Sequence, residues 1–412
     1  MSSADIYLDY QATTPLAPEA LAAMMPWLRD GFANPHSPHK AGRAAHAAVE
    51  VARERILSAL HNLSRATAFV SEAEGSSDAG TGAGGVSTAL DTNGMKEIPK
   101  GQLIFTSGAT EAANMALQGA LALAPAGRRK IVTIATEHAC VRDTALWLGA
   151  HGHQCVMLPV HADGLVDLQA AAAEIDGETA LVAAMLVNNE IGVIQPIEAL
   201  SALARGQGAL LFCDAVQGFG RVPLPVDACD MIALSAHKIH GPKGVGALWL
   251  RDGVAIGPII HGGAQEGGLR SGTLSPALCA GFGAAAELAD ARAAPDAAHV
   301  SALAARLCER LSGWTVNGST DQRYAGNLNL RLPGLDAARL ISELRSVAFS
   351  AGSACASGSG RPSHVLSALG LTDAEARASI RLGFGRYTTM DEIDRAAALI
   401  AEAAARQDAL AA

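Results

Sequence analysis

Seven short apolar runs, separated by stretches with helical periodicity, occupy the middle of this 412-residue chain. The runs cover residues 103–106, 131–135, 155–159, 180–187, 209–213, 231–234 and 246–250. The helical patterns between them include residues 111–123, 141–148 and 197–205. Strands that alternate with helical crossovers form a mostly parallel sheet with helices on both faces. The sequence therefore predicts an α/β fold around a seven-stranded sheet.

The chain is longer than one hydrophobic core usually allows, which predicts a second domain. After residue 277 the sequence is alanine-rich and helical to about residue 311, and later pieces alternate in strand fashion. We predict a large α/β domain over residues 18–276 and a smaller α+β domain formed by residues 1–17 and 277–412. Residues 71–98 are rich in glycine, serine and threonine, so we predict a flexible insert in the large domain.

Charge and cysteine content exclude several classes of function. The net charge of -9 and the pI near 5.8 argue against direct nucleic-acid binding, which needs a basic surface. No apolar stretch is long enough for a membrane span and no signal peptide is visible, so the sequence predicts a cytoplasmic protein without a membrane partner. The seven cysteines are expected to be reduced. No metal site is predicted, because the one His–Cys cluster has no second ligand group nearby.

One lysine stands where a predicted strand ends. The apolar run 231–234 stops at Ser235-Ala-His-Lys238, and two glycines and a proline follow closely. A lysine whose pKa is lowered by burial or by nearby positive charge can form a Schiff base with a carbonyl group. The ordinary alternative is a solvated loop lysine.

A carboxylate stands at the end of another strand, since Asp214 directly follows the run 209–213. Open parallel sheets bind ligands at the carboxyl edge of their strands. A buried carboxylate needs a cationic partner, and the protonated ring nitrogen of pyridoxal 5'-phosphate would supply one. Lys238 and Asp214 therefore predict complementary roles on a single cofactor.

Two further strand ends carry candidate site residues. Gly108, Ala109 and Thr110 follow the strand 103–106 and open a helix, whose N–H groups and positive dipole end favour a phosphate. A helix start with small residues for close packing is the alternative. His138 ends a strand over residues 130–136 and points at the same edge, where a hydrogen-bonded loop histidine is the alternative.

Cys355 differs from the other six cysteines in its surroundings. It lies in the stretch 350–362, which is small, polar and rich in glycine. A thiol exposed on a mobile loop is the usual setting of a reactive cysteine. We therefore predict a chemical role for Cys355, whereas most of the others are expected to be small buried hydrophobes.

Seven short motifs occur in the order found in one known family. They are Thr106-Ser-Gly-Ala-Thr-Glu111, Glu137-His138, Val187-Asn-Asn-Glu-Ile-Gly192, Asp214-Ala-Val-Gln217, Ser235-Ala-His-Lys238, Arg270-Ser-Gly-Thr273 and Ser353-Ala-Cys355. With them the chain resembles the cysteine desulfurases of the NifS/IscS type, which are pyridoxal-phosphate enzymes of the class V aminotransferase family. The resemblance runs from Tyr7 to about Ile393, interrupted by the insert. It implies a type I pyridoxal-phosphate transferase fold and a homodimer with shared active sites.

The same resemblance implies roles for the residues at the sheet edge. Lys238 carries the cofactor and moves protons, Asp214 holds the ring nitrogen, and His138 stacks on the ring and moves protons. The resemblance assigns the cofactor phosphate to Thr110, Ser235, His237 and, from the other subunit, Thr273. It assigns the phenolate oxygen of the cofactor to Asn189 and Gln217.

Substrate binding is assigned to an arginine near the carboxyl terminus. A guanidinium grips a carboxylate through two parallel hydrogen bonds, so Arg381 is the first choice and Arg386 the second. Asn189 is also placed at the substrate carboxylate, and Asn34 lies in a loop that the resemblance puts at the edge of the site. The family commonly has serine two residues after the arginine, whereas this chain has Gly383.

The implied reaction converts L-cysteine to L-alanine and leaves the sulfur on Cys355 as a persulfide. It also implies a sulfur-acceptor protein, for which an iron–sulfur scaffold, a nitrogenase-type assembly protein or a tRNA-thiolation partner fits. Two alternatives stay open. One is a selenocysteine lyase or another reaction on the same cofactor, and the other is a catalytically silent partner protein in sulfur transfer.

Overall fold

The computed structural model describes residues 5–65, 100–352 and 363–411. The predicted insert 71–98 and the candidate residue Cys355 lie outside the described residues.

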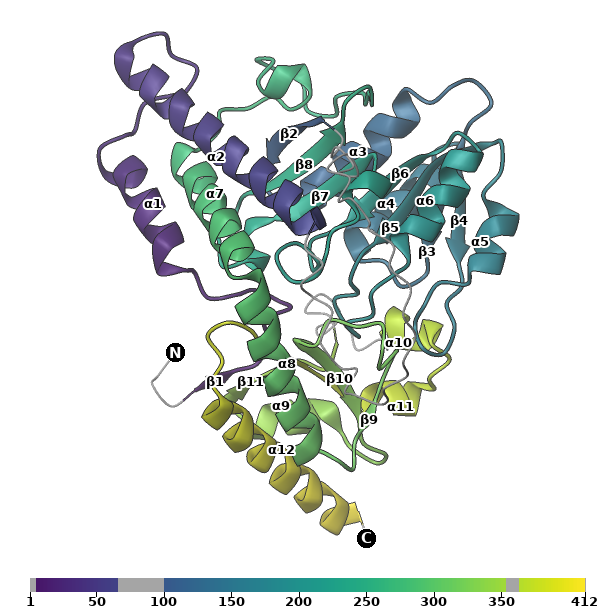
Figure 1. The fold of residues 1–412 in the computed structure, drawn as a ribbon. Helices are drawn as coiled ribbons and strands as arrows, with labels where there is room; N and C mark the ends of the chain where they lie inside the picture. The colour runs from purple at the N-terminus through teal and green to yellow at the C-terminus, as the bar shows by residue number, and fades with distance from the viewer. Residues whose placement is uncertain (1–4, 66–99, 353–362, 412) are drawn as a thin grey trace, which may run out of the picture.

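A seven-stranded sheet forms the centre of the upper half of the molecule in Figure 1. Its strands are β2 (Gly101–Thr106), β3 (Lys130–Ile134), β4 (Gln154–Leu158), β5 (Thr179–Met185), β6 (Leu210–Asp214), β7 (Met231–Ser235) and β8 (Gly246–Arg251). Their order in space is β2-β8-β7-β6-β5-β3-β4. β8 pairs antiparallel with both of its neighbours, and the other pairings are parallel. The predicted seven-stranded, mostly parallel sheet is confirmed.

Helices cover both faces of this sheet, because successive strand residues point to opposite faces. In β5, Leu181 and Ala183 pack in one core with α3 (Ala109–Ala122) and α4 (Ala139–Ala150). Val182 and Ala184 of the same strand pack in another core. That core also holds α2 (Lys40–Arg65), α6 (Ile197–Gly206) and α7 (Pro276–Ala291). All of β5 is buried, as expected for a strand covered on both sides.

A further hydrophobic core holds the lower half of the molecule together. β10 (Asn327–Arg331) pairs antiparallel with β12 (Ser379–Gly383) and β9 (Thr315–Val316), while β1 (Ile6–Tyr7) pairs parallel with β11 (Val347–Ala348). The helices of this core are α8 (Ala293–Arg310), α9 (Ala337–Glu343) and α12 (Met390–Ala411). The apolar side chains of α7, by contrast, belong to the core of the large sheet. The domain boundaries stay a prediction.

The segment after β1, residues 8–17, crosses from the lower core to the upper one, and we call it the arm. Leu8 packs in the lower core and Ala17 in the upper core. Between them, the Thr14 N–H donates to the carbonyl of His237 at 3.0 Å. The arm therefore passes directly beside the end of β7, where Lys238 lies.

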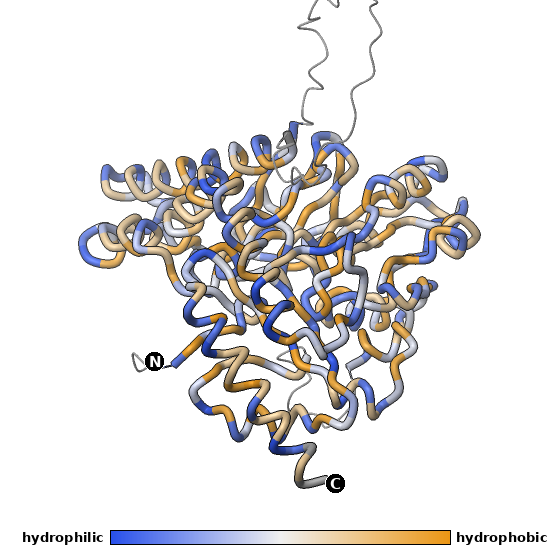
Figure 2. The backbone as a smooth tube through the Cα atoms, turned by 60° about the horizontal axis from the view of Figure 1, so that its bottom comes forward, coloured by the Kyte–Doolittle hydropathy of each residue, from blue (hydrophilic) through white to orange (hydrophobic). Residues whose placement is uncertain are grey.

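The distribution of hydropathy follows this architecture. Hydrophobic segments gather in the interior of the molecule, and helices at the periphery alternate between hydrophobic and hydrophilic turns (Figure 2). The remaining helices are α1 (Pro18–Arg29), α5 (Leu168–Glu174), α10 (His364–Ala368) and α11 (Asp373–Arg377). None of the helices in the described ranges is long and apolar enough to cross a membrane.

Candidate active site

A cavity of about 450 Å³ opens at the carboxyl ends of the parallel strands, and we call it the main cavity. Most residues that the sequence assigned to a cofactor or substrate line it together. They are Gly108, Ala109, Thr110, His138, Asn189, Asp214, Gln217, Ser235, His237, Lys238 and Arg381. These residues come from separate strand ends and from β12, so the fold gathers at one place side chains that are far apart in the sequence.

Lys238 ends a short 3-10 turn, Ala236–Lys238, that directly follows β7. Its Nζ donates to two carbonyl oxygens of the arm, those of Gln11 and, at 2.9 Å, of Ala12. Burial lowers the pKa of Lys238 to about 7, and the positive charges of Arg221 and Arg381 act in the same direction. A large share of the amine is therefore unprotonated near neutral pH, which is the form that attacks a carbonyl group.

Asp214 ends β6 and is only 5% exposed. One of its oxygens accepts the Val216 N–H at 3.0 Å. Burial raises the pKa of Asp214, and His138 and Lys238 oppose this effect in their protonated forms. No salt bridge to Asp214 exists among the residues that the structure describes. A buried carboxylate at a cavity wall without an ion-pair partner is a place where a bound cation is stabilised.

A second buried acid lies close to Asp214. Glu137 is fully buried, and one of its oxygens accepts the Met185 N–H at 2.7 Å. Its other oxygen has no hydrogen-bond partner in the described part of the chain. Burial and the charge of Asp214 raise the pKa of Glu137 well above its ordinary value. Glu137 therefore favours its protonated form more strongly than an ordinary glutamate does.

His138 caps the amino terminus of α4. Its Nδ1 accepts the Cys140 N–H at 3.2 Å and lies 3.0 Å from the Cys140 sulfur. Burial lowers the pKa of His138, so the ring is neutral near pH 7. Because Nδ1 accepts, the single ring proton sits on Nε2. The imidazole can therefore stack on an aromatic ring and donate a proton from Nε2.

The amino terminus of α3 offers unpaired N–H groups to the main cavity. Gly108 precedes the helix and provides no side-chain cap, so the first-turn N–H groups are free to bind an anion. A Cβ on Gly108 would project into open space. Gly246, which starts β8, must remain glycine, because its Cβ would lie 2.8 Å from Gly108 Cα and 2.6 Å from the Leu234 carbonyl. The close approach of β8 thus fixes the position of this helix start.

Arg381 is the assigned arginine that reaches the main cavity. It is 1% exposed, pairs with Asp9 at 2.8 Å and donates to the Asn189 carbonyl at 3.0 Å. Arg386, the second choice, pairs with Asp296 at 2.7 Å and lines a different cavity. The structure therefore favours Arg381 for an anionic group in the main cavity.

The departure at Gly383 has a steric reason. A Cβ at this position would lie 1.5 Å from Oε1 of Gln11, a buried residue of the arm. The Gln11 side chain is held by a hydrogen bond from Nε2 to the Gly326 carbonyl at 2.9 Å. Gln11 therefore fills the space that a serine side chain at 383 would need.

Two assigned residues lie away from the main cavity of their own chain. Thr273 and Asn34 are both exposed and do not line it. Asn34 uses its side-chain oxygen to accept the His36 N–H at 2.9 Å, which is a turn-forming contact. Their chain neighbours line a separate surface hollow of about 620 Å³, which we call the outer hollow. These neighbours are Pro35, His36 and Leu274.

The described residues on either side of Cys355 lie beside the main cavity. Ser350 forms a β-bridge with Arg381, with the Arg381 N–H donating to the Ser350 carbonyl at 2.6 Å. On the other side of the segment, Ser363 donates through its hydroxyl to the carboxylate of Glu190. Glu190 directly follows Asn189, which lines the main cavity. Ser350 and Ser363, the described residues nearest to Cys355 with these contacts, are therefore both tied to neighbours of this cavity.

Sequence reasoning missed several contacts of this site. The carbonyls of Gln11 and Ala12, which receive the Lys238 amine, belong to an arm that by itself predicts only a strand and a turn. Asp9, which pairs with Arg381, and Cys140, which contacts His138, were not assigned either. The only signal for the arm was the family resemblance, which places this segment near the active site.

The arrangement fits pyridoxal phosphate. Lys238 would hold its aldehyde carbon, Asp214 would face the ring nitrogen, and the first turn of α3 would bind the phosphate. The fit rests on the buried carboxylate without an ion-pair partner, on the open space next to Gly108 and on an amine with a lowered pKa. All three features line the same cavity.

Comparisons with known proteins agree with this assignment. The family model "Aminotransferase class-V" matches residues 6–78 and 94–396. A protein of Rickettsia rickettsii (strain Iowa), named cysteine desulfurase IscS, is 39% identical over 404 residues, which cover 96% of this chain and 90% of that protein. Its counterpart in Rickettsia bellii (strain OSU 85-389) is 40% identical over the same shares of both chains.

Solved structures show the same relationship. A structure named NifS-like protein superposes with a TM-score of 0.82 at 29% identity, covering 97% of this chain and 98% of that one. A structure described as SspA in complex with cysteine gives a TM-score of 0.74 at 32% identity, covering 93% and 100%. The matches extend over nearly the whole chain in sequence and in fold, so this chain belongs to the class V aminotransferase family, among its pyridoxal-phosphate-dependent cysteine desulfurases.

Proposed function

We propose that the main cavity takes sulfur from L-cysteine and passes it to Cys355. In this reaction the carbon–sulfur bond of the substrate breaks and a sulfur–sulfur bond to Cys355 forms. The substrate carbon that loses sulfur gains a proton, and the Cys355 thiol loses its proton when it bonds to that sulfur. L-Cysteine and a thiol thus become L-alanine and a persulfide. The single observation that carries the proposal is the meeting of Lys238, Asp214 and the start of α3 in one cavity.

Each of these groups has a task that its surroundings support. Pyridoxal phosphate, when bound, supplies a conjugated ring that accepts the electrons of the substrate α-carbon. Asp214 would face the ring nitrogen and keep it protonated, since a buried carboxylate stabilises a nearby cation. Lys238 has a pKa near 7, so its amine can both take and return the α-proton at neutral pH. His138 offers the Nε2–H of its neutral ring as a hydrogen-bond donor to the bound cofactor or substrate.

Substrate binding is proposed for Arg381 and Asn189. The two terminal nitrogens of the Arg381 guanidinium already bind Asp9 and the Asn189 carbonyl. Its Nε has no partner among the described residues, so the side chain retains a donor for a carboxylate. A carboxylate anchored at Arg381 lies beside Ser350, from which the chain leads to Cys355.

We also propose that the catalytic unit is a homodimer in which Thr273 serves the partner's cavity. Support comes from the exposed position of Thr273 outside its own cavity. Exposed apolar side chains gather on α1 and just after it, where Phe32 is 91% exposed and Leu28 is 58% exposed. Apolar exposure of this kind is typical of surfaces that contact another chain.

The destination of the sulfur is proposed by analogy. The protein hands its sulfur to an acceptor protein such as an iron–sulfur scaffold in the cytoplasm. A net charge of -9 makes a basic face on that acceptor favourable. A nitrogenase-type assembly protein and a tRNA-thiolation partner are the other candidates.

Mass spectrometry after incubation with L-cysteine tests the proposal. We expect a mass increase of one sulfur atom on the peptide that contains Cys355, together with L-alanine in solution. The Cys355→Ser variant should retain the cofactor absorbance and lose the persulfide. A Cys308→Ser variant is the matched control and should behave as the wild type. L-Selenocysteine in the same assay separates a desulfurase from a selenocysteine lyase, and persulfide on a different cysteine would contradict the proposal.

A further inference from the structure

Arg221 contacts Lys238 from the side opposite the main cavity. It follows β6 by seven residues and does not line the main cavity. Its guanidinium donates to the Lys238 carbonyl at 2.6 Å, to the Tyr10 carbonyl at 3.5 Å and to the side-chain oxygen of Gln217. The three acceptors belong to three segments, namely the turn after β7, the arm and the loop after β6.

These contacts close a ring around Lys238. Gln217 uses its Nε2 to donate to the Gln11 carbonyl at 3.0 Å, and the same carbonyl accepts the Lys238 amine. Arg221 thereby holds the backbone of Lys238 directly and holds the carbonyls that receive its amine through Gln217 and Tyr10. The backbone and the side-chain amine of Lys238 are therefore both positioned by contacts that lead to the Arg221 guanidinium.

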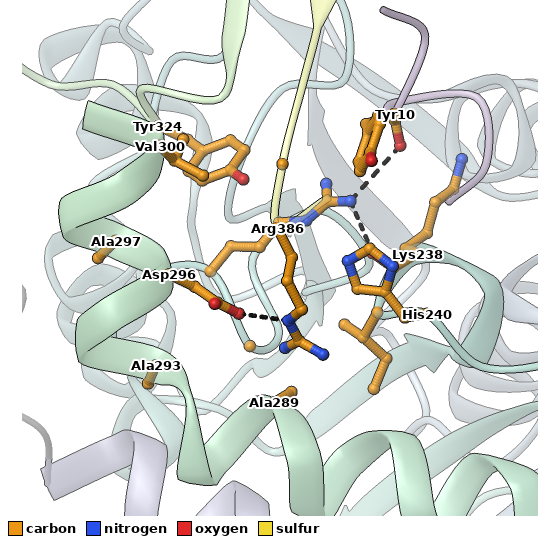
Figure 3. A pocket seen from close by; sticks show the side chains of 14 residues that line it. Tyr10, Lys238, His240, Ala289, Ala293, Asp296, Ala297, Val300, Tyr324 and Arg386 are labelled. Atoms are coloured by element: carbon orange, nitrogen blue, oxygen red, sulfur yellow. Dashed lines mark hydrogen bonds and ion pairs between the residues drawn. The ribbon is translucent and has the colours of Figure 1, made fainter. Parts of the chain in front are cut away.

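The charge of Arg221 is not balanced by an acid. Arg221 lines a small cavity of about 40 Å³ on this side of Lys238, which Figure 3 shows together with Arg386 and Asp296. Asp296 pairs with Arg386 at 2.7 Å, and no salt bridge to Arg221 is formed within the described ranges. The remaining neighbour is the ring of Tyr324, whose centroid lies 5.4 Å from the guanidinium carbon. A buried cation without a counter-ion lowers the stability of the fold. A neutral donor could form hydrogen bonds here at a lower cost, so the positive charge itself needs an explanation.

We propose that Arg221 is a positioning residue for Lys238. Arg221 orients the lysine by binding its backbone carbonyl and the arm, and its fixed positive charge disfavours protonation of the lysine amine. The proposal rests on the proposed role of Lys238 as the amine that binds the cofactor. Arg221 itself touches neither cofactor nor substrate positions in the main cavity.

The electrostatics around Lys238 agree with this assignment. After burial, Arg221 is the strongest contribution that lowers the pKa of Lys238, followed by Arg381, while Asp9 and Asp214 raise it. The three histidines around this region, His138, His237 and His240, all have lowered pKa values and are neutral near pH 7. On the side of the small cavity, Arg221 is therefore the charge that lowers the pKa of Lys238, whereas Arg386 and Asp296 pair with each other there.

The test measures the pH dependence of amine reactivity in the protein without cofactor. Trinitrobenzenesulfonate arylates only the unprotonated amine, and peptide mass spectrometry reports the extent at Lys238. For the wild type we expect a midpoint near pH 7. Arg221→Met should raise this midpoint by about one pH unit or more, because it removes a like charge. Arg221→Gln, which can donate but has no charge, should give the same shift and serves where the methionine variant does not fold. Arg221→Lys should keep a midpoint closer to that of the wild type.

The matched control is Arg386→Met, which removes another arginine from the same small cavity; in the described part of the chain Arg386 pairs with Asp296 and forms no hydrogen bond or ion pair with Lys238. Its midpoint should equal that of the wild type. A folded Arg221→Met or Arg221→Gln protein with an unchanged midpoint would overturn the inference. That result differs from failure of the proposed function, in which wild-type Lys238 forms no adduct with pyridoxal phosphate at all.

Discussion

Residues assigned to the same chemistry lie in the main cavity and beside the outer hollow, yet these two regions are built differently. The main cavity is lined by side chains from strand ends, from the arm and from β12, and about half of them are buried. The outer hollow is lined from the loop around residue 35, from α2 and from residues 263–267, and Thr273 beside it is exposed. Parallel-sheet topology gathers residues at one edge of the same chain. In the proposed homodimer, residues outside that edge would complete the site of the second chain.

The loop that leads to Thr273 is nevertheless firmly attached. Glu266 pairs with Arg53 at 2.9 Å and accepts the Phe105 N–H at 2.7 Å. Arg270 pairs with Glu111, in the first turn of α3, at 2.6 Å. The loop beside the outer hollow therefore holds Thr273 in place, because Arg270 ties this loop to the first turn of α3.

The largest effect is expected from Lys238→Ala, which breaks the main cavity itself. Without the amine, the cofactor cannot be held covalently and the α-proton has no carrier, so alanine production should fall by more than about 10³-fold. The visible absorbance of the bound cofactor should change with it. Lys243→Ala is the matched control, since Lys243 also lines this cavity but is exposed. Equal losses in both variants would remove Lys238 from the assignment.

A smaller effect is expected where the arm meets β12. Gly383→Ser forces a side chain into the space of Gln11 and should lower the free energy of unfolding by about 1–3 kcal/mol, as overpacking does. Gly177→Ser is the control, because a Cβ there meets nothing within 4 Å. Urea denaturation measures the free energy of unfolding of both variants. If Gln11→Ala fails to restore the stability of Gly383→Ser, the steric account of this position is wrong.

The smallest effect is expected at the outer hollow. Thr273→Ala removes one hydrogen bond to a charged group, so the Kd of the cofactor should rise by about tenfold, or 1.4 kcal/mol. Mixed dimers sharpen the comparison. A dimer of one Lys238→Ala chain and one Thr273→Ala chain contains one intact site if Thr273 crosses to the partner, and that site should bind the cofactor with wild-type affinity. Weakened binding in the mixed dimer would place Thr273 in its own subunit's site.

The two regions also differ in how far the sequence predicts them. Lys238, Asp214 and His138 were recognisable because each lies within four residues of the end of an apolar run, and the ends of parallel strands meet at one edge. The arm carbonyls that accept the Lys238 amine could not be recognised from the sequence. Every residue has a carbonyl, and no side-chain pattern marks the ones that form these hydrogen bonds. The pair of Asp9 and Arg381 joins positions at opposite ends of the chain, and only the folded structure shows it.

Reduction of the cofactor-loaded protein with borohydride, followed by peptide mass spectrometry, tests the central claim most directly. The reagent converts a Schiff base into a stable amine, so the modified lysine is identified without any assay of activity. We expect a pyridoxyl phosphate group on Lys238 and on no other lysine. The same group on Lys243, or a protein that retains no cofactor on any lysine, would contradict the account.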